Sequence, residues 1–307
     1  MIPIITIEGA TASGKSTLAI QLAELLSSQI ISADSRQVYR FMDIGTAKVS
    51  IEDQHKATHH LIDIINPDDC YNAGAFVKEA SALIDTLASQ GIIPIVCGGT
   101  GLYIKSLLDG LFTLPDLPTS VRSELKERLS KEGKATLYSE LQSLDPSFAA
   151  NISANDTQRI LRGLEVAIGT GKSISEHWRN QISQPRYKAF RILVDLPRPL
   201  LYNKINERLE QMVACGLVEE MQSLFSMGYT SSCPGLNSLG YKEFIPYFTM
   251  GAKLDECADN AAQHHRNYAK RQCTWYRKCT FDLTLDSFPV RLSEISHIIE
   301  ERLIRGI

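Results

Sequence analysis

The chain has 307 residues, of which 44% are hydrophobic and 22% charged, and its formal net charge is −3. This composition is typical of a globular protein, and the length is enough for one large α/β domain together with a smaller one. No stretch comes near the ~20 consecutive apolar residues of a membrane-spanning helix, and no basic segment precedes the N-terminal apolar run, as it would in a signal peptide. The 7 cysteines never occur in C-x-x-C spacing, which argues against a zinc site or a disulfide framework. We therefore expect a cytoplasmic protein that does not enter a membrane.

A phosphate-binding motif stands close to the N-terminus. Residues 9–16 read Gly-Ala-Thr-Ala-Ser-Gly-Lys-Ser, which fits the pattern G-x-x-x-x-G-K-[ST]. The apolar run 2–7 before it predicts a strand, and the leucines of 15–27 after it predict a helix. Converging backbone N–H groups, the charge of Lys15 and the helix N-terminus would hold a di- or triphosphate, and the hydroxyl of Ser16 suits Mg²⁺. The residues expected at the phosphates are Gly9, Ala10, Thr11, Ala12, Ser13, Gly14, Lys15 and Ser16.

Two further strands should end beside this loop. The run 29–33 leads to Asp34, whereas the run 92–97 leads to two glycines and then to Thr100. Ligands of parallel α/β folds bind at the carboxyl ends of the strands, so we expect Asp34 and Thr100 to flank the ligand. Asp34 is then either a metal-holding residue or a general base.

The rest of the chain continues the alternation of strands and helices and then interrupts it. Segment 43–72 is polar and irregular and is expected to cross the active-site edge. Residues 119–182 have helical periodicity without a convincing strand, and a strand returns at 190–194. Further helices are expected at 74–90, 100–108, 200–214, 216–226, 241–248, 254–278 and 291–304.

The order of these elements predicts the fold class. Alternating strands and helices indicate an α/β protein with a parallel sheet. We expect a P-loop NTPase-like core formed by residues 1–113 and 187–307. A helical insertion domain of residues 114–186 would interrupt this core.

Basic and aromatic residues gather near the C-terminus. Between Asp259 and Asp282 the chain has no acidic residue. That window interleaves cations with aromatic residues, namely Arg266, Lys270, Arg271, Arg277 and Lys278 with Tyr268, Trp275 and Tyr276. The pattern indicates a surface for RNA or polyphosphate, although a solvated helix face or a helix packed on the sheet would also produce it. A second basic patch reads Gln158-Arg159-Ile160-Leu161-Arg162.

Several segments together resemble one known family. They are Gly9–Thr17, Asp34–Tyr39, Met42–Lys48, His59–Asp63, Gly98–Tyr103, Arg159–Val166, Gly240–Glu243 and Tyr268–Arg277. In this order, and over nearly the whole chain, they closely resemble the bacterial tRNA dimethylallyltransferases. The chain departs from the family's usual residues at Ala10, Gly163 and Asn267, and none of these changes removes a charge or nucleophile that the chemistry needs.

The resemblance implies a prenyl transfer. Members move a five-carbon isoprenoid from dimethylallyl diphosphate to the N6 amine of the adenine at tRNA position 37. For this chain the resemblance implies Mg²⁺ as cofactor, with dimethylallyl diphosphate and tRNA as partners, and we expect a monomer. Asp34 would accept the amine proton, Lys15 and Arg208 would stabilise the diphosphate, and Thr100 would lie near both. The expected tRNA contacts are Asp34, Ser35, Arg36, Gln37, Thr100, Arg122, Gln158, Arg159, Ile160, Leu161, Arg162, Lys270 and Arg271.

The residues also leave other interpretations open. A small-molecule P-loop kinase would use the same loop for ATP, with Asp34 as metal ligand or as base for a hydroxyl, but it gives no role to the basic helix. An RNA-binding protein without enzymatic activity would leave the loop vestigial, which the intact Lys15 and Ser16 disfavour. The alternative interpretation of Arg208 is a solvated cation on a helix face. Retained tRNA binding together with absent ATPase activity would separate the prenyltransferase from the kinase.

Overall fold

The computed structural model describes residues 1–110, 117–180 and 185–305. The chain divides into two compact units, Met1–Asp109 with Pro185–Ile307, and Gly110–Gln184. The smaller unit therefore interrupts the larger one in sequence. The boundary expected between residues 113 and 114 lies outside the described residues.

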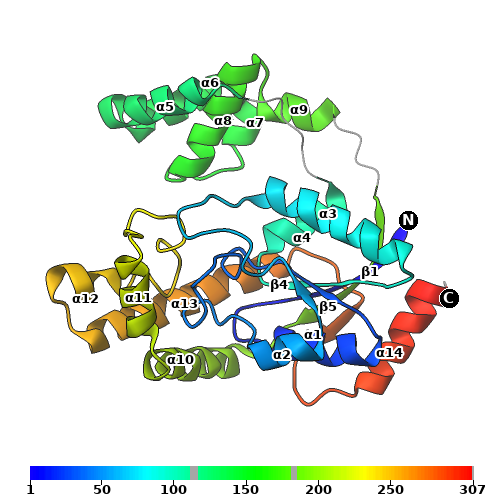
Figure 1. Cartoon of the computed structure of the whole chain (residues 1–307). Helices are drawn as coiled ribbons and strands as arrows, with labels where there is room; N and C mark the ends of the chain where they lie inside the picture. The colour runs from blue at the N-terminus through cyan, green and yellow to red at the C-terminus, as the bar shows by residue number, and fades with distance from the viewer. Residues whose placement is uncertain (111–116, 181–184, 306–307) are drawn as a thin grey trace. The chain divides into compact units, whose positions relative to one another are not determined.

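Parallel strands form the sheet of the larger unit (Figure 1). Their order among the described residues is β3-β2-β4-β1-β5-β6, which confirms the predicted parallel α/β core. The edge strands β3 and β6 have 2 and 3 residues and were not predicted, because so short a run shows no periodic pattern. The strands are β1 (Ile2–Gly9), β2 (Ile30–Ser32), β3 (His59–His60), β4 (Ile95–Gly98), β5 (Tyr187–Val194) and β6 (Leu283–Leu285).

The register of the central strands brings their carboxyl ends to one level. Glu8 in β1 lies opposite Gly98 in β4 and Leu193 in β5. Ser32, the last residue of β2, lies opposite Cys97 of β4. The loops that follow β1, β2 and β4 therefore leave the sheet at the same edge, where ligands of such folds bind.

Helices cover both faces of the sheet. One layer is formed by α1 and α14 and the other by α3 and α4 (Figure 1). Neighbouring residues of β1 divide between these layers, since Ile5 joins the core under α1 and Ile4 joins the core under α3. Burial on both faces explains why the strands read as apolar runs. The helices are α1 (Lys15–Leu25), α3 (Ala73–Ser89), α4 (Gly101–Asp109) and α14 (Leu292–Ile299).

A third core forms where later helices pack against the segment between β2 and β3. Met42 of this segment and Tyr241 are fully buried in it. The predicted helix 241–248 is partly wrong: residues 241–244 form turns, and the helix begins next to Pro246, a residue that favours a first helical turn. The helices are α10 (Arg198–Ala214), α11 (Leu217–Ser226), α12 (Ile245–Met250) and α13 (Leu254–Tyr276).

Two short elements complete the larger unit. The segment expected to be irregular contains α2 (Ile51–Lys56), whose N-cap Ser50 accepts a hydrogen bond from the N–H of Asp53 at 3.1 Å. A single capped turn and a half is too short to show helical periodicity in sequence. After α14 the chain continues as a π-helix, η1 (Glu300–Arg305).

The smaller unit is built from helices around its own apolar core. Asp145 joins two of them, because one carboxylate oxygen accepts from the N–H of Phe148 at 3.0 Å and the other from the N–H of Ser175 at 2.9 Å. The core residues include Leu125, Leu137, Leu141, Ile160 and Leu164. The helices are α5 (Thr119–Glu132), α6 (Lys134–Leu144), α7 (Pro146–Ala149), α8 (Thr157–Thr170) and α9 (Ile174–Asn180).

None of the helices in the described ranges combines the length and apolar character of a membrane span. The longest, α13, has 23 residues and carries acidic residues in its first turn and several cations further on.

Candidate active site

The phosphate loop joins β1 to α1 at the edge of the sheet. Gly14, directly before α1, has a φ of +90°, a conformation that glycine adopts without strain. Gly9 ends β1, and a Cβ added there would lie 2.7 Å from the carbonyl oxygen of Val194 in β5. The two glycines of the motif are therefore required by this backbone, one for its conformation and one for the close approach of a neighbouring strand.

A cavity of about 360 Å³ lies between the phosphate loop and α10. Lys15 and Ser16 line it from the loop, and Arg208 lines it from α10. The guanidinium of Arg208 donates a hydrogen bond from Nη2 to the hydroxyl of Thr11 at 2.6 Å, and Lys15 Nζ donates to the carbonyl of Ala10 at 3.4 Å. The fold thus brings together the residues that were expected at a diphosphate from separate parts of the sequence.

Lys15 and Arg208 have no ion-pair partner among the described residues. Lys204 and Glu207 also line this cavity. Burial is the main cause that lowers the pKa of Lys15, and the nearby charge of Arg208 lowers it further. Cys97 and Asp34 act in the opposite direction and raise this pKa. Burial also lowers the pKa of Arg208, against the opposing effect of Asp34. Half-buried cations without a paired carboxylate favour an anionic ligand, and a diphosphate meets this requirement.

Two hydroxyl groups of the loop bear on the question of a metal ion. The hydroxyl of Ser13 is buried and has no hydrogen-bond partner in the described chain, and Ser16 is half-buried at the cavity. Among the described residues no three His, Cys, Asp or Glu side chains are grouped to hold a metal. Mg²⁺ commonly takes few protein ligands and fills its shell with water and substrate phosphates. Ser16 together with a bound diphosphate therefore fits Mg²⁺.

A second cavity, of about 280 Å³, shares Lys15 and Arg208 with the first. Asp34, Ser35 and Arg36, which follow β2, line this second cavity. The Asp34 carboxylate accepts a hydrogen bond from the N–H of Arg36 at 2.8 Å, which holds it at the end of the strand. Because the same two cations line both cavities, the anion-binding end and the carboxylate end form one continuous site.

Thr100 links the ends of β2 and β4. Its hydroxyl accepts a hydrogen bond from the N–H of Ser35 at 3.1 Å, and its own N–H donates to the carbonyl of Ala33 at 3.3 Å. A Cβ added at Gly98 would lie 2.1 Å from that carbonyl oxygen, so β2 and β4 approach this closely only because the residue is glycine. Thr100 is thereby held beside Asp34, as the strand ends suggested.

Helix α13 contributes a residue to which the sequence assigned no role. Gln272 is 6% exposed, accepts a hydrogen bond from the N–H of Thr11 at 2.9 Å and donates one to the carbonyl of Gly99 at 2.8 Å. The sequence signal for Gln272 is a polar residue at a position that the helical periodicity places on the buried face. The buried stripe of α13 consists of Cys257, Ala261, His265, Ala269, Gln272 and Tyr276.

Besides Gln272, three residues of α13 line the cavity with Asp34, namely His265, Tyr268 and Arg271. Burial raises the pKa of Tyr268 to about 12, while a hydrogen bond with Thr100 lowers it slightly. Burial lowers the pKa of His265 to about 4, and its Nδ1 lies 2.8 Å from the carbonyl of Ala261. His265 is therefore neutral near pH 7, with the proton on Nδ1.

The exposed and buried faces of α13 differ in character. Lys270 and Arg271 are exposed, and the guanidinium of Arg271 lies 5.6 Å from the centre of the Tyr268 ring. On the inner face a Cβ added at Gly101 would lie 2.2 Å from Nε1 of Trp275, so this indole packs directly on the start of α4. The helix covers the sheet with one face and presents cations on the other, and RNA binding by those cations stays a prediction.

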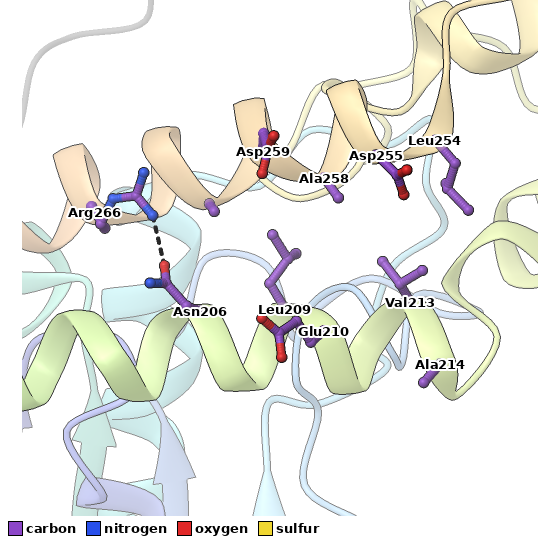
Figure 2. A pocket seen from close by; sticks show the side chains of 11 residues that line it. Asn206, Leu209, Glu210, Val213, Ala214, Leu254, Asp255, Ala258, Asp259 and Arg266 are labelled. Carbon is purple, nitrogen blue, oxygen red and sulfur yellow. Dashed lines mark hydrogen bonds between the residues drawn. The ribbon is translucent and has the colours of Figure 1, made fainter.

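A second groove between α10 and α13 lies outside this site. Figure 2 shows that Arg266 faces Asn206 across the helices, with a hydrogen bond of 2.6 Å to Asn206 Oδ1. Arg266 therefore helps to join the helices, unlike the exposed cations of α13. The groove has a volume of about 430 Å³, and its charged lining includes Glu210, Asp255 and Asp259. Those carboxylates disfavour phosphate or RNA there.

The loop of residues 43–46 is held by a carboxylate to which the sequence analysis assigned no role. Glu220 of α11 accepts hydrogen bonds from the N–H groups of residues 43–45 at 2.7 to 3.2 Å. It also accepts one from the hydroxyl of Tyr241 at 2.6 Å. Gly45 and Thr46 of this loop line the cavity that contains Asp34.

Gln37 differs from its neighbours after β2. It is buried, and its amide donates to the carbonyl of Ala47 at 3.0 Å and accepts from the hydroxyl of Ser32 at 3.4 Å. Its side chain is thus occupied within the chain, and a contact with tRNA stays a prediction.

The predicted RNA residues of the smaller unit have different surroundings. Arg122, Gln158 and Arg159 are exposed, and Arg162 donates to the carboxylate of Glu165 at 2.8 Å. Leu161 is half-buried and Ile160 is 0% exposed within the core, and a tRNA contact of either residue stays a prediction.

Fold and site together define a P-loop α/β protein whose anion-binding cavity continues to a strand-end carboxylate. Residues 37–279 match the model of the IPP transferase family. The tRNA dimethylallyltransferase of Geobacter sulfurreducens is 42% identical over 276 residues, covering 90% of this chain and 89% of the relative. That of Staphylococcus carnosus is 39% identical over 307 residues, covering 97% of each chain. The chain belongs to the IPP transferase family.

Solved structures agree with this assignment. The tRNA isopentenylpyrophosphate transferase of Bacillus halodurans aligns with a TM-score of 0.73 and 33% identity, covering 99% of this chain and 98% of that one. A eukaryotic dimethylallyltransferase acting on tRNA aligns with a TM-score of 0.81 and 26% identity over 100% of this chain and 77% of that one. These likenesses confirm the P-loop NTPase-like core with its helical insertion.

Proposed function

We propose that this chain transfers the dimethylallyl group of dimethylallyl diphosphate to N6 of adenosine 37 in tRNA, giving N6-isopentenyladenosine and releasing diphosphate. The observation that carries the proposal is the pair Lys15 and Arg208, two cations without an ion-pair partner in the described chain that line both the anion-binding cavity and the cavity containing Asp34. A leaving group and a proton acceptor therefore meet in one site. The names of the similar proteins support tRNA as the acceptor.

Asp34 is the proton acceptor of the proposed reaction. The lone pair of the adenine amine is delocalised into the purine, so the amine attacks well only if its proton is removed as the new N–C bond forms. A carboxylate at a strand end beside the anion site can take that proton. The N–H of Arg36 donates a hydrogen bond of 2.8 Å to the Asp34 carboxylate, and this bond fixes the orientation of the carboxylate.

The leaving diphosphate gains negative charge as the bond from its oxygen to the allylic carbon breaks. Lys15, Arg208 and the backbone N–H groups of the phosphate loop would stabilise that charge where it grows, which would lower the barrier. Bound Mg²⁺ would add charge neutralisation of the same kind, and Ser16 is the residue that would hold it.

Adenosine 37 must leave the stack of the anticodon loop to reach Asp34. Extrusion of a base costs a few kcal/mol, which contacts elsewhere on the RNA must offset. The exposed cations of α13, Lys270 and Arg271, are suited to the phosphates, and so are Arg122 and Arg159 of the smaller unit. We further propose that the enzyme acts as a monomer in the cytoplasm.

The kinase interpretation is not favoured, since the family and its solved structures are prenyltransferases acting on tRNA. The experiment that tests the proposal incubates the protein with unmodified tRNA, dimethylallyl diphosphate and Mg²⁺, with ATP in a parallel reaction. Mass spectrometry of the nucleosides should detect N6-isopentenyladenosine in the first reaction. Phosphate transfer from ATP without any prenylated nucleoside would contradict the proposal.

A further inference from the structure

Gln272 is a buried polar residue whose side chain contacts both ends of the site. Its amide oxygen accepts a hydrogen bond from the N–H of Thr11 at 2.9 Å, and its amide nitrogen donates to the carbonyl of Gly99 at 2.8 Å. One planar amide from α13 therefore spans the phosphate loop and the turn between β4 and α4.

The two contacts lead to opposite ends of the proposed reaction. Thr11 belongs to the anion-binding end, where its hydroxyl accepts from Arg208 at 2.6 Å. Gly99 directly precedes Thr100, whose hydroxyl accepts from the N–H of Ser35 at 3.1 Å, next to Asp34. The distance between leaving group and proton acceptor thus depends on what joins Thr11 to Gly99.

The junction is tightly packed. A Cβ added at Gly99 would lie 2.5 Å from the amide nitrogen of Gln272. Three residues further along α13, Trp275 packs equally closely on Gly101. Oε1 and Nε2 of Gln272 each make one hydrogen bond to the main chain, and these two bonds fix the orientation of the amide at the edge of the cavity.

We propose that Gln272 is a positioning residue that fixes the spacing between the diphosphate end and the Asp34–Thr100 end of the site. The inference rests on the proposed function, since the spacing matters only when one reaction joins both ends. Loss of the amide leaves each end able to bind its own substrate but misaligns the attacking amine with the allylic carbon. A misplacement of about 1 Å can cost ~10²-fold in rate.

The first test replaces Gln272 with methionine, which has a similar length and removes both hydrogen bonds. Gln272→Met should lower kcat by ~10–100-fold. KM for both substrates, and the separately measured affinities for pyrophosphate and for tRNA, should stay within about threefold of wild type. Gln222→Met at an exposed position of α11 is the matched control and should keep wild-type kinetics.

The second test acts on the same contact from the other side. Gly99→Ala places a methyl group against Nε2 of Gln272, which is the atom nearest to the added carbon. The methyl group should therefore push the Gln272 amide away from Gly99. Gly99→Ala should also lower kcat at nearly constant KM. The double variant should be no slower than the slower single variant, since both changes break one contact.

Several outcomes would overturn the inference. They are a higher KM with unchanged kcat, a loss of activity that matches a loss of folded protein by circular dichroism, and multiplicative effects in the double variant. Should Gln272→Met fail to fold, the kcat and KM of Gly99→Ala decide alone. A wild-type protein that binds tRNA and pyrophosphate but transfers no dimethylallyl group would overturn the proposed function and this inference with it.

Discussion

Individual residues of the site owe their chemistry to burial and to neighbours far away in sequence. Lys15 and Arg208 are ordinary cations in sequence, but the fold holds them together around Thr11 without an ion-pair partner among the described residues. Asp34 is close enough to raise the pKa of both. These cations can therefore bind an anion in the cavity of the phosphate loop, while Asp34 can accept a proton in the adjoining cavity.

Asp34→Asn tests the proton acceptor. Turnover should fall by ~10²–10⁴, the usual contribution of a positioned general base, because an amide cannot take the proton of N6. Affinity for tRNA should hardly change, since the substitution preserves shape. The measurement is single-turnover prenylation beside filter binding of tRNA. Turnover within a few-fold of wild type would remove Asp34 from this role.

His265 predicts a pH dependence of stability. Its pKa is lowered by burial to about 4 from an ordinary value of 6.5. The imidazole of His265 therefore binds a proton more tightly in the unfolded chain than in the folded one. The neutral imidazole contributes fully to the free energy of unfolding above pH 6.5, and this contribution is lost as the pH falls toward 4. His265→Asn, which keeps a donor for the Ala261 carbonyl, should flatten the fall in unfolding free energy across this range.

The measurement is the free energy of unfolding in urea, determined at several pH values between 4 and 6.5. His55→Gln at an exposed position is the control and should reproduce the wild-type curve. Wild-type and His265→Asn curves that run parallel would show that His265 does not titrate in this way.

At the scale of elements, sequence patterns predicted those that are long or carry a motif. The strand–loop–helix at the N-terminus and the long helix α13 are where periodicity and glycine spacing placed them. The short elements β3, β6 and α2 could not be predicted, because their structure depends on neighbours in the sheet and on a single cap. The contact of Gln272 with Thr11 joins residues 261 positions apart, and no local pattern encodes it.

The same element carries the test of RNA binding. Lys270→Ala and Arg271→Ala should each weaken tRNA binding and reduce the slope of log affinity against log salt by somewhat less than ~1 unit. Pyrophosphate binding should stay the same, because Lys15 and Arg208 provide that charge. Melting temperatures should also stay near wild type, since both side chains are exposed.

Arg266→Ala is the contrasting variant on α13. Its guanidinium bonds to Asn206 between the helices, so the substitution should lower the melting temperature more than it changes the salt slope (Figure 2). Lower melting temperatures for the Lys270 and Arg271 variants, with unchanged salt slopes, would mean that the exposed face of the helix is structural.

At the scale of the whole molecule, the larger unit contains the complete set of reacting groups proposed above. Asp34, Thr100, Lys15 and Arg208 all belong to it, and so does the basic face of α13. The smaller unit has its own core and adds exposed arginines, which we expect to affect tRNA affinity and leave the chemistry unchanged. The central claim is therefore that one continuous site delivers a dimethylallyl group to one nucleoside of tRNA.

That claim is tested most directly by incubating the protein and Mg²⁺ with radioactive dimethylallyl diphosphate and two matched tRNAs, one with adenosine at position 37 and one with guanosine there. Label should enter only the tRNA with adenosine, and digestion should release it as N6-isopentenyladenosine. Equal labelling of both tRNAs, or labelling of neither by folded protein that binds them, would contradict the account.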